Sequence, residues 1–169
     1  VLCIFDSEEV GSSSVQGAAS RLLQTTVDRI CQALTLDAAQ LLSNSFMLSA
    51  DNAHAVHPNH PEYADANNAP VMNGGVVLKF NANQRYTTDA PGAARWARLC
   101  RDAGIPYQEF VSHNSVPCGS TIGPLTATRL GIRTVDVGIP LLSMHSAREM
   151  AGVQDPFYLA RVSEVFFIR

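Results

Sequence analysis

The stretch STIGPLTATRLGIRTVDV, residues 120–137, decides the fold because it places a helix, a stop signal and a strand in direct succession. Residues 120–130 predict a helix, and Gly131 follows at the position where glycine commonly closes a helix. Residues 132–137 then predict a strand. A helix that leads straight into a strand is typical of a domain in which the two kinds of element alternate.

The rest of the chain continues this alternation. Apolar runs predict further strands at 1–5, 45–50, 75–80 and 107–111, and helices are predicted at 16–34, 91–103 and 153–167. Residues 51–73 predict a long loop rich in Asn, His, Pro and Ala. The alternation implies an α/β fold, a three-layer sandwich with a mainly parallel central sheet flanked by helices. In that sheet, residues 1–5 are expected to form a strand covered on both faces.

Composition and charge exclude several classes of protein. The 169 residues are 46% hydrophobic and 16% charged with a net charge of −3, which suits one ordinary α/β domain. No basic run is present, so we expect no nucleic-acid partner, and no apolar stretch approaches the roughly 20 residues of a membrane span. The cysteines form no CxxC pair, which favours free thiols in a reducing compartment, so we expect a cytoplasmic protein.

Polar residues follow the predicted strands at the edge where α/β sheets bind ligands. Glu8 and Glu9 come after the first strand, Asp51 ends the second, and His145 follows residues 132–137. Adjacent carboxylates repel each other and lose hydration there unless a cation compensates them. Two carboxylates and an imidazole suit zinc, with the remaining carboxylate as a general base. A solvated Glu-Glu turn and a hydrogen-bonded histidine at a helix start are the alternatives.

Cys118, in VPCGSTIGP, supports a different hypothesis. A cysteine before Gly-Ser at the N-terminus of a predicted helix could have a lowered pKa, and His113 lies five residues upstream. The protein would then be a thiol hydrolase centred on Cys118. A glycine-rich turn without a catalytic role fits the same residues.

Five blocks of sequence, taken together and in order, resemble the aspartyl aminopeptidase family. They are FDSEEVGSSSVQGA, SADNAHAVHPNHPEY, NANQRYTTDA, CGSTIGP and IRTVDVGIPLLSMHSARE. Members of this family are dizinc metallopeptidases that remove N-terminal Asp or Glu from peptides. The resemblance therefore implies a metalloaminopeptidase with two zinc ions in each active site of the intact protein, where other divalent ions could replace zinc.

The resemblance also implies a role for individual residues. Glu8 matches the general base for a metal-bound water, and the residues that match zinc ligands are Glu9, Asp51 and His145. The residues that match substrate-contacting positions are Glu8, Asp51, His54, Lys79 and Tyr86. Lys79 is the only lysine of the chain, and an acidic substrate side chain needs a positive partner. A surface lysine in a strand is the alternative.

The chain also departs from the family pattern. Family members take a further zinc-binding His, an Asp that bridges the metals and an inserted assembly domain from segments that this sequence lacks, and His113 replaces a common cation. We therefore expect residues 1–169 to be the C-terminal portion of the catalytic domain, incomplete at its N-terminal side. Such a piece should bind metal weakly and be inactive alone, whereas the intact protein should form a homo-oligomer, a dodecamer in the family. An assembly or regulatory fragment remains the alternative.

Overall fold

The computed structural model describes residues 1–120 and 122–168 and confirms the predicted α/β class. The helices are α1 (Leu22–Leu34), α2 (Ala38–Ser43), η1 (Pro61–Tyr63), α3 (Ala90–Ala103), α4 (Ile122–Leu130) and α5 (Asp155–Ile168). The strands are β1 (Phe46–Ala50), β2 (Ala53–His54), β3 (Val76–Phe80), β4 (Tyr107–Val111), β5 (Arg133–Gly138), β6 (Pro140–Leu142) and β7 (Met150–Ala151).

Two sheets organise the chain. The larger one has the strand order β1-β5-β3-β4, in which β1 is parallel to β5, β3 is parallel to β4, and β3 and β5 are antiparallel. The smaller sheet has the order β2-β6-β7 and continues from the ends of β1 and β5. The carboxyl ends of β1 and β5 therefore lead side by side into the segments that carry Asp51 and, further along the chain, His145.

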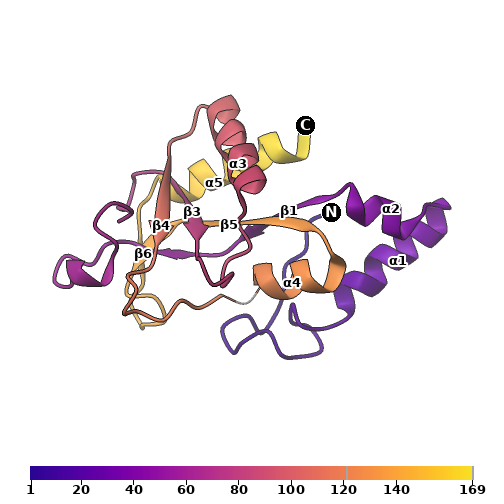
Figure 1. Ribbon diagram of the computed structural model, residues 1–169, viewed down its shortest axis with the longest axis horizontal. Coiled ribbons are helices and arrows are strands. Elements are labelled where there is room, and N and C mark those ends of the chain that lie inside the picture. The colour runs from indigo at the N-terminus through magenta and orange to yellow at the C-terminus, as the bar shows by residue number, and fades with distance from the viewer. Residues whose placement is uncertain (121, 169) are drawn as a thin grey trace.

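Helices cover both faces of the larger sheet, as the three-layer prediction requires. Helices α3 and α5 lie on one face and α4 lies on the other (Figure 1). The main core forms under α3 and α5, where the buried side chains include Trp96, Leu78, Val135, Val137 and Val162. Burial of these apolar side chains stabilises the sheet that positions the polar residues at its edge.

The αβ unit of residues 120–137 forms as predicted. Helix α4 ends at Leu130, Gly131 adopts the left-handed conformation with φ 65°, and β5 follows. Glycine takes this conformation without the steric cost that a Cβ would add. Residue 120 lies before α4, and residue 121 of the predicted helix lies outside the described residues.

The prediction of a buried strand at residues 1–5 is wrong. These residues have no regular secondary structure, and Val1, Leu2 and Ile4 are 83%, 73% and 85% exposed. A strand needs a hydrogen-bonded neighbour and a covered face, and residues 1–5 have neither, because they do not pair with the edge strand β1 or with any other described strand. Residues 1–5 are apolar, but they neither pair with a described strand nor bury most of their apolar side chains.

The first predicted helix starts later than expected. Helix α1 begins at Leu22 rather than at residue 16, because the preceding residues form tight turns. A Cβ on Gly17 would lie 2.1 Å from the backbone oxygen of Ser12, and Ser12 itself has φ 61°. This packed turn is incompatible with a continuous helix.

A set of hydrogen bonds ties the start of α5 to the turn before β3. The buried carboxylate of Asp155 accepts from Asn73 N at 2.7 Å and from Gly75 N at 3.3 Å. The side-chain oxygen of Asn73 accepts in return from Gln154 N at 3.0 Å, and Gly74 N donates to the carbonyl of Val71. The turn that leads into β3 is therefore fixed from both sides.

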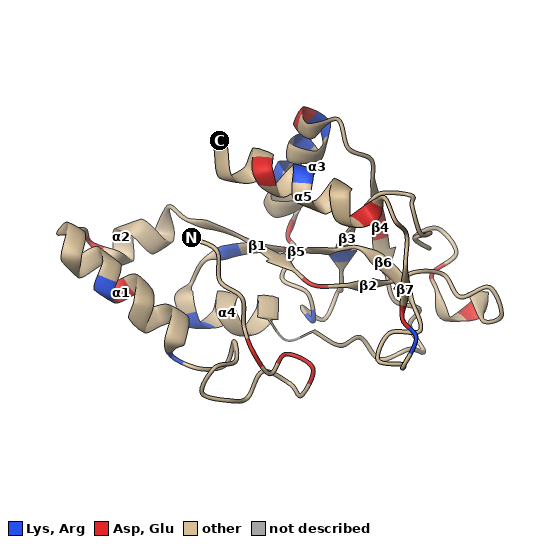
Figure 2. Ribbon diagram, turned by 180° about the vertical axis from the view of Figure 1, so that it is seen from behind, with Lys and Arg blue, Asp and Glu red and all other residues tan. Residues whose placement is uncertain are grey.

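Charged residues are spread along the fold. Figure 2 shows basic and acidic residues interspersed on the helices, with acidic residues on the N-terminal loop. No described helix has the length and apolarity that crossing a membrane would require.

Candidate active site

Glu9 and His145 meet although they come from opposite ends of the chain. Oε2 of Glu9 lies 2.7 Å from Nε2 of His145, and both side chains are largely exposed. Glu9 belongs to the N-terminal loop, and His145 belongs to the loop between β6 and β7. The structure thus brings together two of the three residues that were predicted to bind zinc.

Both loops carry residues with left-handed backbone. Ser7 has φ 63°, Ser143 has φ 59° and His145 has φ 68°. The backbone N–H of His145 donates to Oε1 of Glu149 at 2.6 Å, which supports this turn. Non-glycine residues in this conformation cost energy and are concentrated at functional sites.

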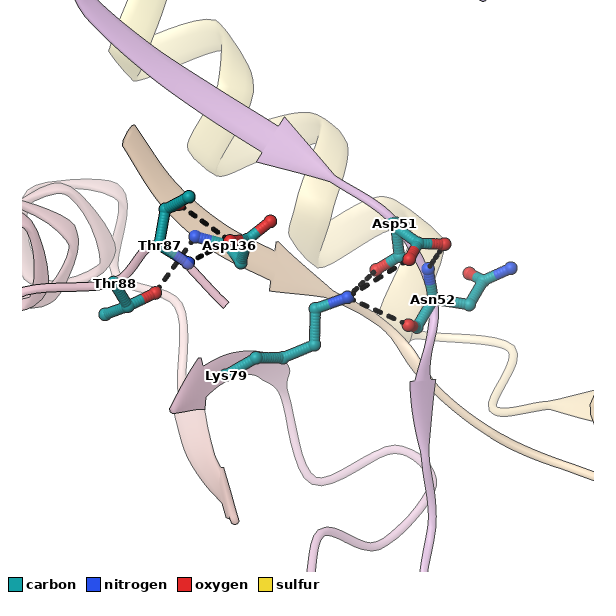
Figure 3. Close-up of polar contacts among 6 residues, drawn as sticks. All are labelled: Asp51, Asn52, Lys79, Thr87, Thr88 and Asp136. Atoms are coloured by element: carbon teal, nitrogen blue, oxygen red, sulfur yellow. Dashed lines mark hydrogen bonds and ion pairs between the residues drawn. The ribbon is translucent and has the colours of Figure 1, made fainter. Parts of the chain in front are cut away.

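Asp51 lies at the end of β1 and contacts Lys79 of β3 (Figure 3). Nζ of Lys79 lies 3.3 Å from Oδ2 of Asp51 and donates to the carbonyls of Asn52 at 3.1 Å and Asp51 at 3.4 Å. Lys79 is 1% exposed, whereas Asp51 is 29% exposed. Lys79 is therefore a buried cation held by three oxygen atoms, and the alternative of a surface lysine is wrong.

Tyr86 lies against the same lysine. Nζ of Lys79 is 5.0 Å from the centre of the Tyr86 ring, and the phenol forms a hydrogen bond with Cys118. The ring of Tyr86 packs edge-on against Phe110, whose other ring neighbour is His54. These contacts gather three predicted substrate-contacting residues, His54, Lys79 and Tyr86, around one wall of the site.

His54 and Tyr86 open onto a cleft of about 340 Å³ between the loop after β2, the loop after β4 and strand β6. Its lining is mainly apolar and aromatic and includes Phe110, Leu141 and Met144. Met144 precedes His145, and the charge of His145 acts on His54 in the cleft wall, so the Glu9–His145 pair lies near the cleft. A cleft of this kind can hold an organic ligand next to the charged residues.

Burial and nearby charges keep two residues of the cleft wall, His54 and Tyr86, uncharged. Loss of hydration lowers the pKa of His54, and the charges of Lys79 and His145 lower it further, against the opposing effect of Asp51. Burial, followed by the hydrogen bond with Cys118, raises the pKa of the Tyr86 phenol. Near neutral pH the imidazole of His54 and the phenol of Tyr86 are therefore uncharged, and each can donate or accept a hydrogen bond.

The thiol of Cys118 lines the cleft, and in the described part of the chain no hydrogen bond joins it to an imidazole. Its described hydrogen-bond partner is Tyr86, and His113 is bonded to Ser115 through Nδ1 at 2.7 Å. A thiol nucleophile needs a neighbouring base to become a thiolate. These contacts do not form the pair that the thiol-hydrolase hypothesis requires.

The described residues do not form a complete zinc site. Across residues 1–120 and 122–168, no group of three or more histidine, cysteine, aspartate or glutamate side chains is close enough to hold a metal ion. A catalytic zinc usually has about three protein ligands. Glu9 and His145 supply two suitable donors, but the carboxylate of Asp51 is engaged with Lys79.

The sequence matches a family model over almost its whole length. Residues 1–167 match the model described as Aminopeptidase I zinc metalloprotease (M18). The chain belongs to the M18 family. Its relatives include the probable M18 family aminopeptidase 2 of Streptomyces coelicolor, which is 49% identical over 169 residues, and that of Clostridium acetobutylicum, which is 47% identical over 170 residues.

Solved M18 structures share this fold. The prApe1 crystal structure has a TM-score of 0.93 and 39% identity over 98% of this chain and 35% of that chain. The mApe1 dodecamer of S. cerevisiae has a TM-score of 0.87 and 37% identity over 98% of this chain and 37% of that one. The match to the S. coelicolor relative covers 98% of this chain and 39% of that protein, and the match to the C. acetobutylicum relative covers 99% of this chain and 39% of that protein. This chain therefore spans about two fifths of the length of these curated relatives.

Membership of the M18 family confirms the predicted resemblance. The family is described as a zinc metalloprotease family, and its curated relatives are named as aminopeptidases. Sequence reasoning missed Asp136, a buried carboxylate beside Tyr86 that bonds to Thr87. The signal was a charged residue inside a predicted buried strand, where an unpaired carboxylate would be costly.

Proposed function

We propose that this M18 chain supplies part of the active site of a zinc-dependent aminopeptidase that removes N-terminal Asp or Glu from peptides. The contact between Glu9 and His145 carries the proposal, because it joins two zinc-type ligands from distant parts of the chain beside a cleft. In the intact protein we take residues 1–169 to be the C-terminal portion of the catalytic domain, completed by ligands from elsewhere.

Each candidate residue has a role in this proposal. Glu8, next to the ligand Glu9, takes the proton from the attacking water as general base. Asp51 becomes the third ligand once further protein ligands complete the site. Zinc polarises the scissile carbonyl when it is bound.

Lys79 explains the preference for acidic residues. A buried ammonium group needs a negative partner, and here that partner is the carboxylate of Asp51. With Asp51 as a ligand, the ammonium group of Lys79 would be left to pair with the carboxylate of an acidic substrate side chain. His54 and Tyr86, which are both uncharged, orient the substrate by hydrogen bonds.

We also propose that the intact protein is a homo-oligomer that acts on peptides in the cytoplasm. The solved relatives include a dodecamer of mApe1 from S. cerevisiae, which supports assembly of an M18 chain into identical subunits. The four free cysteines support a reducing compartment.

The test is a chimera in which residues 1–169 replace the matching part of the S. coelicolor relative. Zinc content and release of Asp from Asp-peptides are measured on the chimera and on the 169-residue chain. We expect about two zinc ions per subunit and chelator-sensitive hydrolysis in the chimera alone. Glu8→Gln should abolish hydrolysis and leave zinc bound.

A matched variant separates the two hydrolase mechanisms. Cys118→Ala should leave hydrolysis within about threefold of the chimera, because no described hydrogen bond pairs the thiol with a base. Activity that survives chelation, or that depends on Cys118 and not on Glu8, would overturn the proposal. Activity of the short chain alone would overturn the assignment of residues 1–169 as an incomplete site.

A further inference from the structure

Asp136 is a buried residue of β5, and both hydrogen bonds to its carboxylate go to the same oxygen atom, Oδ2. It is 0% exposed, and its Oδ2 accepts from Thr87 N at 2.6 Å and from Thr87 Oγ1 at 2.7 Å (Figure 3). Its own backbone N–H donates to Thr88 Oγ1 at 3.0 Å. Three hydrogen bonds therefore tie the centre of β5 to residues 87 and 88.

The carboxylate is held in one orientation. A Cβ on Gly123 of α4 would lie 2.1 Å from Asp136 Oδ1, so the helix packs directly on this oxygen. Within the described part of the chain, Oδ1 has no hydrogen-bond partner. A buried carboxylate with one unpartnered oxygen is costly for stability. The cost indicates a role beyond packing.

The segment that Asp136 holds has no regular structure of its own. Residues 81–89 connect β3 to α3 as turns and coil, so side-chain hydrogen bonds place its backbone. The side-chain oxygen of Asn81 accepts from Asn83 N and Arg85 N and orders the first half. Asp136 orders the second half through Thr87, whose N–H belongs to the peptide bond that follows Tyr86.

The position of Tyr86 decides the shape of the cleft wall. Its ring lies under Nζ of Lys79, packs on Phe110, and its phenol reaches Cys118 on the opposite loop. A rotation of the peptide after Tyr86 would move the phenol relative to all three neighbours. The anchor at Thr87 prevents that rotation.

We propose that Asp136 is a positioning residue that fixes the phenol of Tyr86 in the cleft by holding the peptide bond between residues 86 and 87. Its relevance to hydrolysis rests on the proposed function, in which Tyr86 orients the substrate. The position of Tyr86 itself can be measured without zinc or substrate.

The experiment uses the 169-residue chain labelled with 3-fluorotyrosine. The chain has four tyrosines, and Tyr86→Phe identifies the ¹⁹F resonance of residue 86. Asp136→Asn weakens both bonds to Thr87, and Thr87→Val removes the bond from Oγ1 and keeps the bond from the backbone N–H. We expect both variants to shift the Tyr86 resonance and to speed alkylation of Cys118, about tenfold for Asp136→Asn.

Asp155→Asn is the matched control. Asp155 is also 0% exposed and also accepts from backbone N–H groups, at Asn73 and Gly75, but it lies at the start of α5. This variant should lower stability and leave the Tyr86 resonance and the Cys118 rate unchanged. If Asp136→Asn does not fold, as judged by near-ultraviolet circular dichroism, the Tyr86 resonance and the Cys118 alkylation rate of Thr87→Val test the proposal instead.

Two results would overturn the proposal. One is an unshifted Tyr86 resonance and an unchanged Cys118 rate in folded Asp136→Asn and Thr87→Val chains. The other is an equal response to Asp155→Asn, which would mean that Asp136 acts through general stability. Failure of the chimera to hydrolyse Asp-peptides would overturn the proposed function. The Tyr86 resonance and the Cys118 alkylation rate would still test the positioning role of Asp136.

Discussion

Replacing Lys79 with methionine removes a buried cation and keeps most of the side-chain volume. Methionine cannot make the contacts of Nζ with Asp51 Oδ2 at 3.3 Å, Asp51 O at 3.4 Å and Asn52 O at 3.1 Å, or the contact 5.0 Å from the Tyr86 ring. The variant therefore tests whether the ion pair at the end of β1 holds this part of the sheet together.

The magnitude follows from the unequal burial of the two charges. Removing one partner of a buried ion pair costs ~3–5 kcal/mol when the other charge stays buried. After Lys79→Met the remaining carboxylate of Asp51 is 29% exposed and can be hydrated, so we expect a loss of only ~1–3 kcal/mol. Asp51→Asn leaves the ammonium group of Lys79, which is 1% exposed, without its partner and should cost ~3–5 kcal/mol.

The assay is urea unfolding with a chelator present, followed by the fluorescence of Trp96, the single and fully buried tryptophan. Arg85→Met is the matched control, because it removes an exposed cation in the same way and should change stability by less than ~0.5 kcal/mol. The double variant should be more stable than Asp51→Asn alone. The reasoning is refuted if Asp51→Asn costs no more than Lys79→Met, or if Lys79→Met behaves like Arg85→Met.

Three further predictions concern packing, pH and thiol access. Gly123→Ala should destabilise the chain by ~1–3 kcal/mol in urea unfolding, because the new Cβ would lie 2.1 Å from Asp136 Oδ1; an unchanged midpoint would contradict the close packing of α4. The folded state lowers the pKa of His54, so the unfolded chain takes up this proton first as the pH falls below ~6.5, and stability is lost there. The loss between pH 7.5 and 5.5 should be smaller in His54→Gln, and equal slopes would count against the lowered pKa. Burial raises the pKa of Cys100 to about 12, so Ellman's reagent should modify Cys100 and the buried Cys31 only after unfolding. Rapid reaction of all four thiols in the native chain would contradict the burial of Cys31 and Cys100.

Much of the fold could be predicted because periodicity and caps are local. Strand β3, helix α3 with its stop at Gly104, and the unit from α4 to β5 lie within a few residues of their predicted positions. Residues 1–5 show the limit of this reasoning. An apolar run signals that burial is favourable, but burial also needs a partner, and sequence does not say whether the partner is present.

The candidate site was predictable to the same degree. The approach of Glu9 to His145 was predicted from the position of polar residues after strands, but the strand at residues 1–5 on which the argument for Glu9 depended does not form. Sequence reasoning could not predict that Asp51 contacts Lys79. The sequence does not show which of the carboxylates near the sheet edge lies next to the lysine, and only the tertiary structure does. Asp136 was missed although a charged residue inside a predicted buried strand was a signal, because its partner Thr87 is distant in sequence and only the tertiary structure shows the contact.

The turn before β3 has a consequence for the chemical ageing of the chain. Asn73-Gly74 is a dipeptide prone to deamidation, in which the backbone nitrogen of the glycine attacks the carboxamide carbon of the asparagine, ammonia leaves and a succinimide forms. Here Gly74 N is bonded to Val71, and the Asn73 carboxamide is held by Gln154 N. The folded chain should therefore deamidate slowly at this position, and unfolding should release both groups. The fraction of Asn73 converted in a stored sample would then record how long its molecules have spent unfolded.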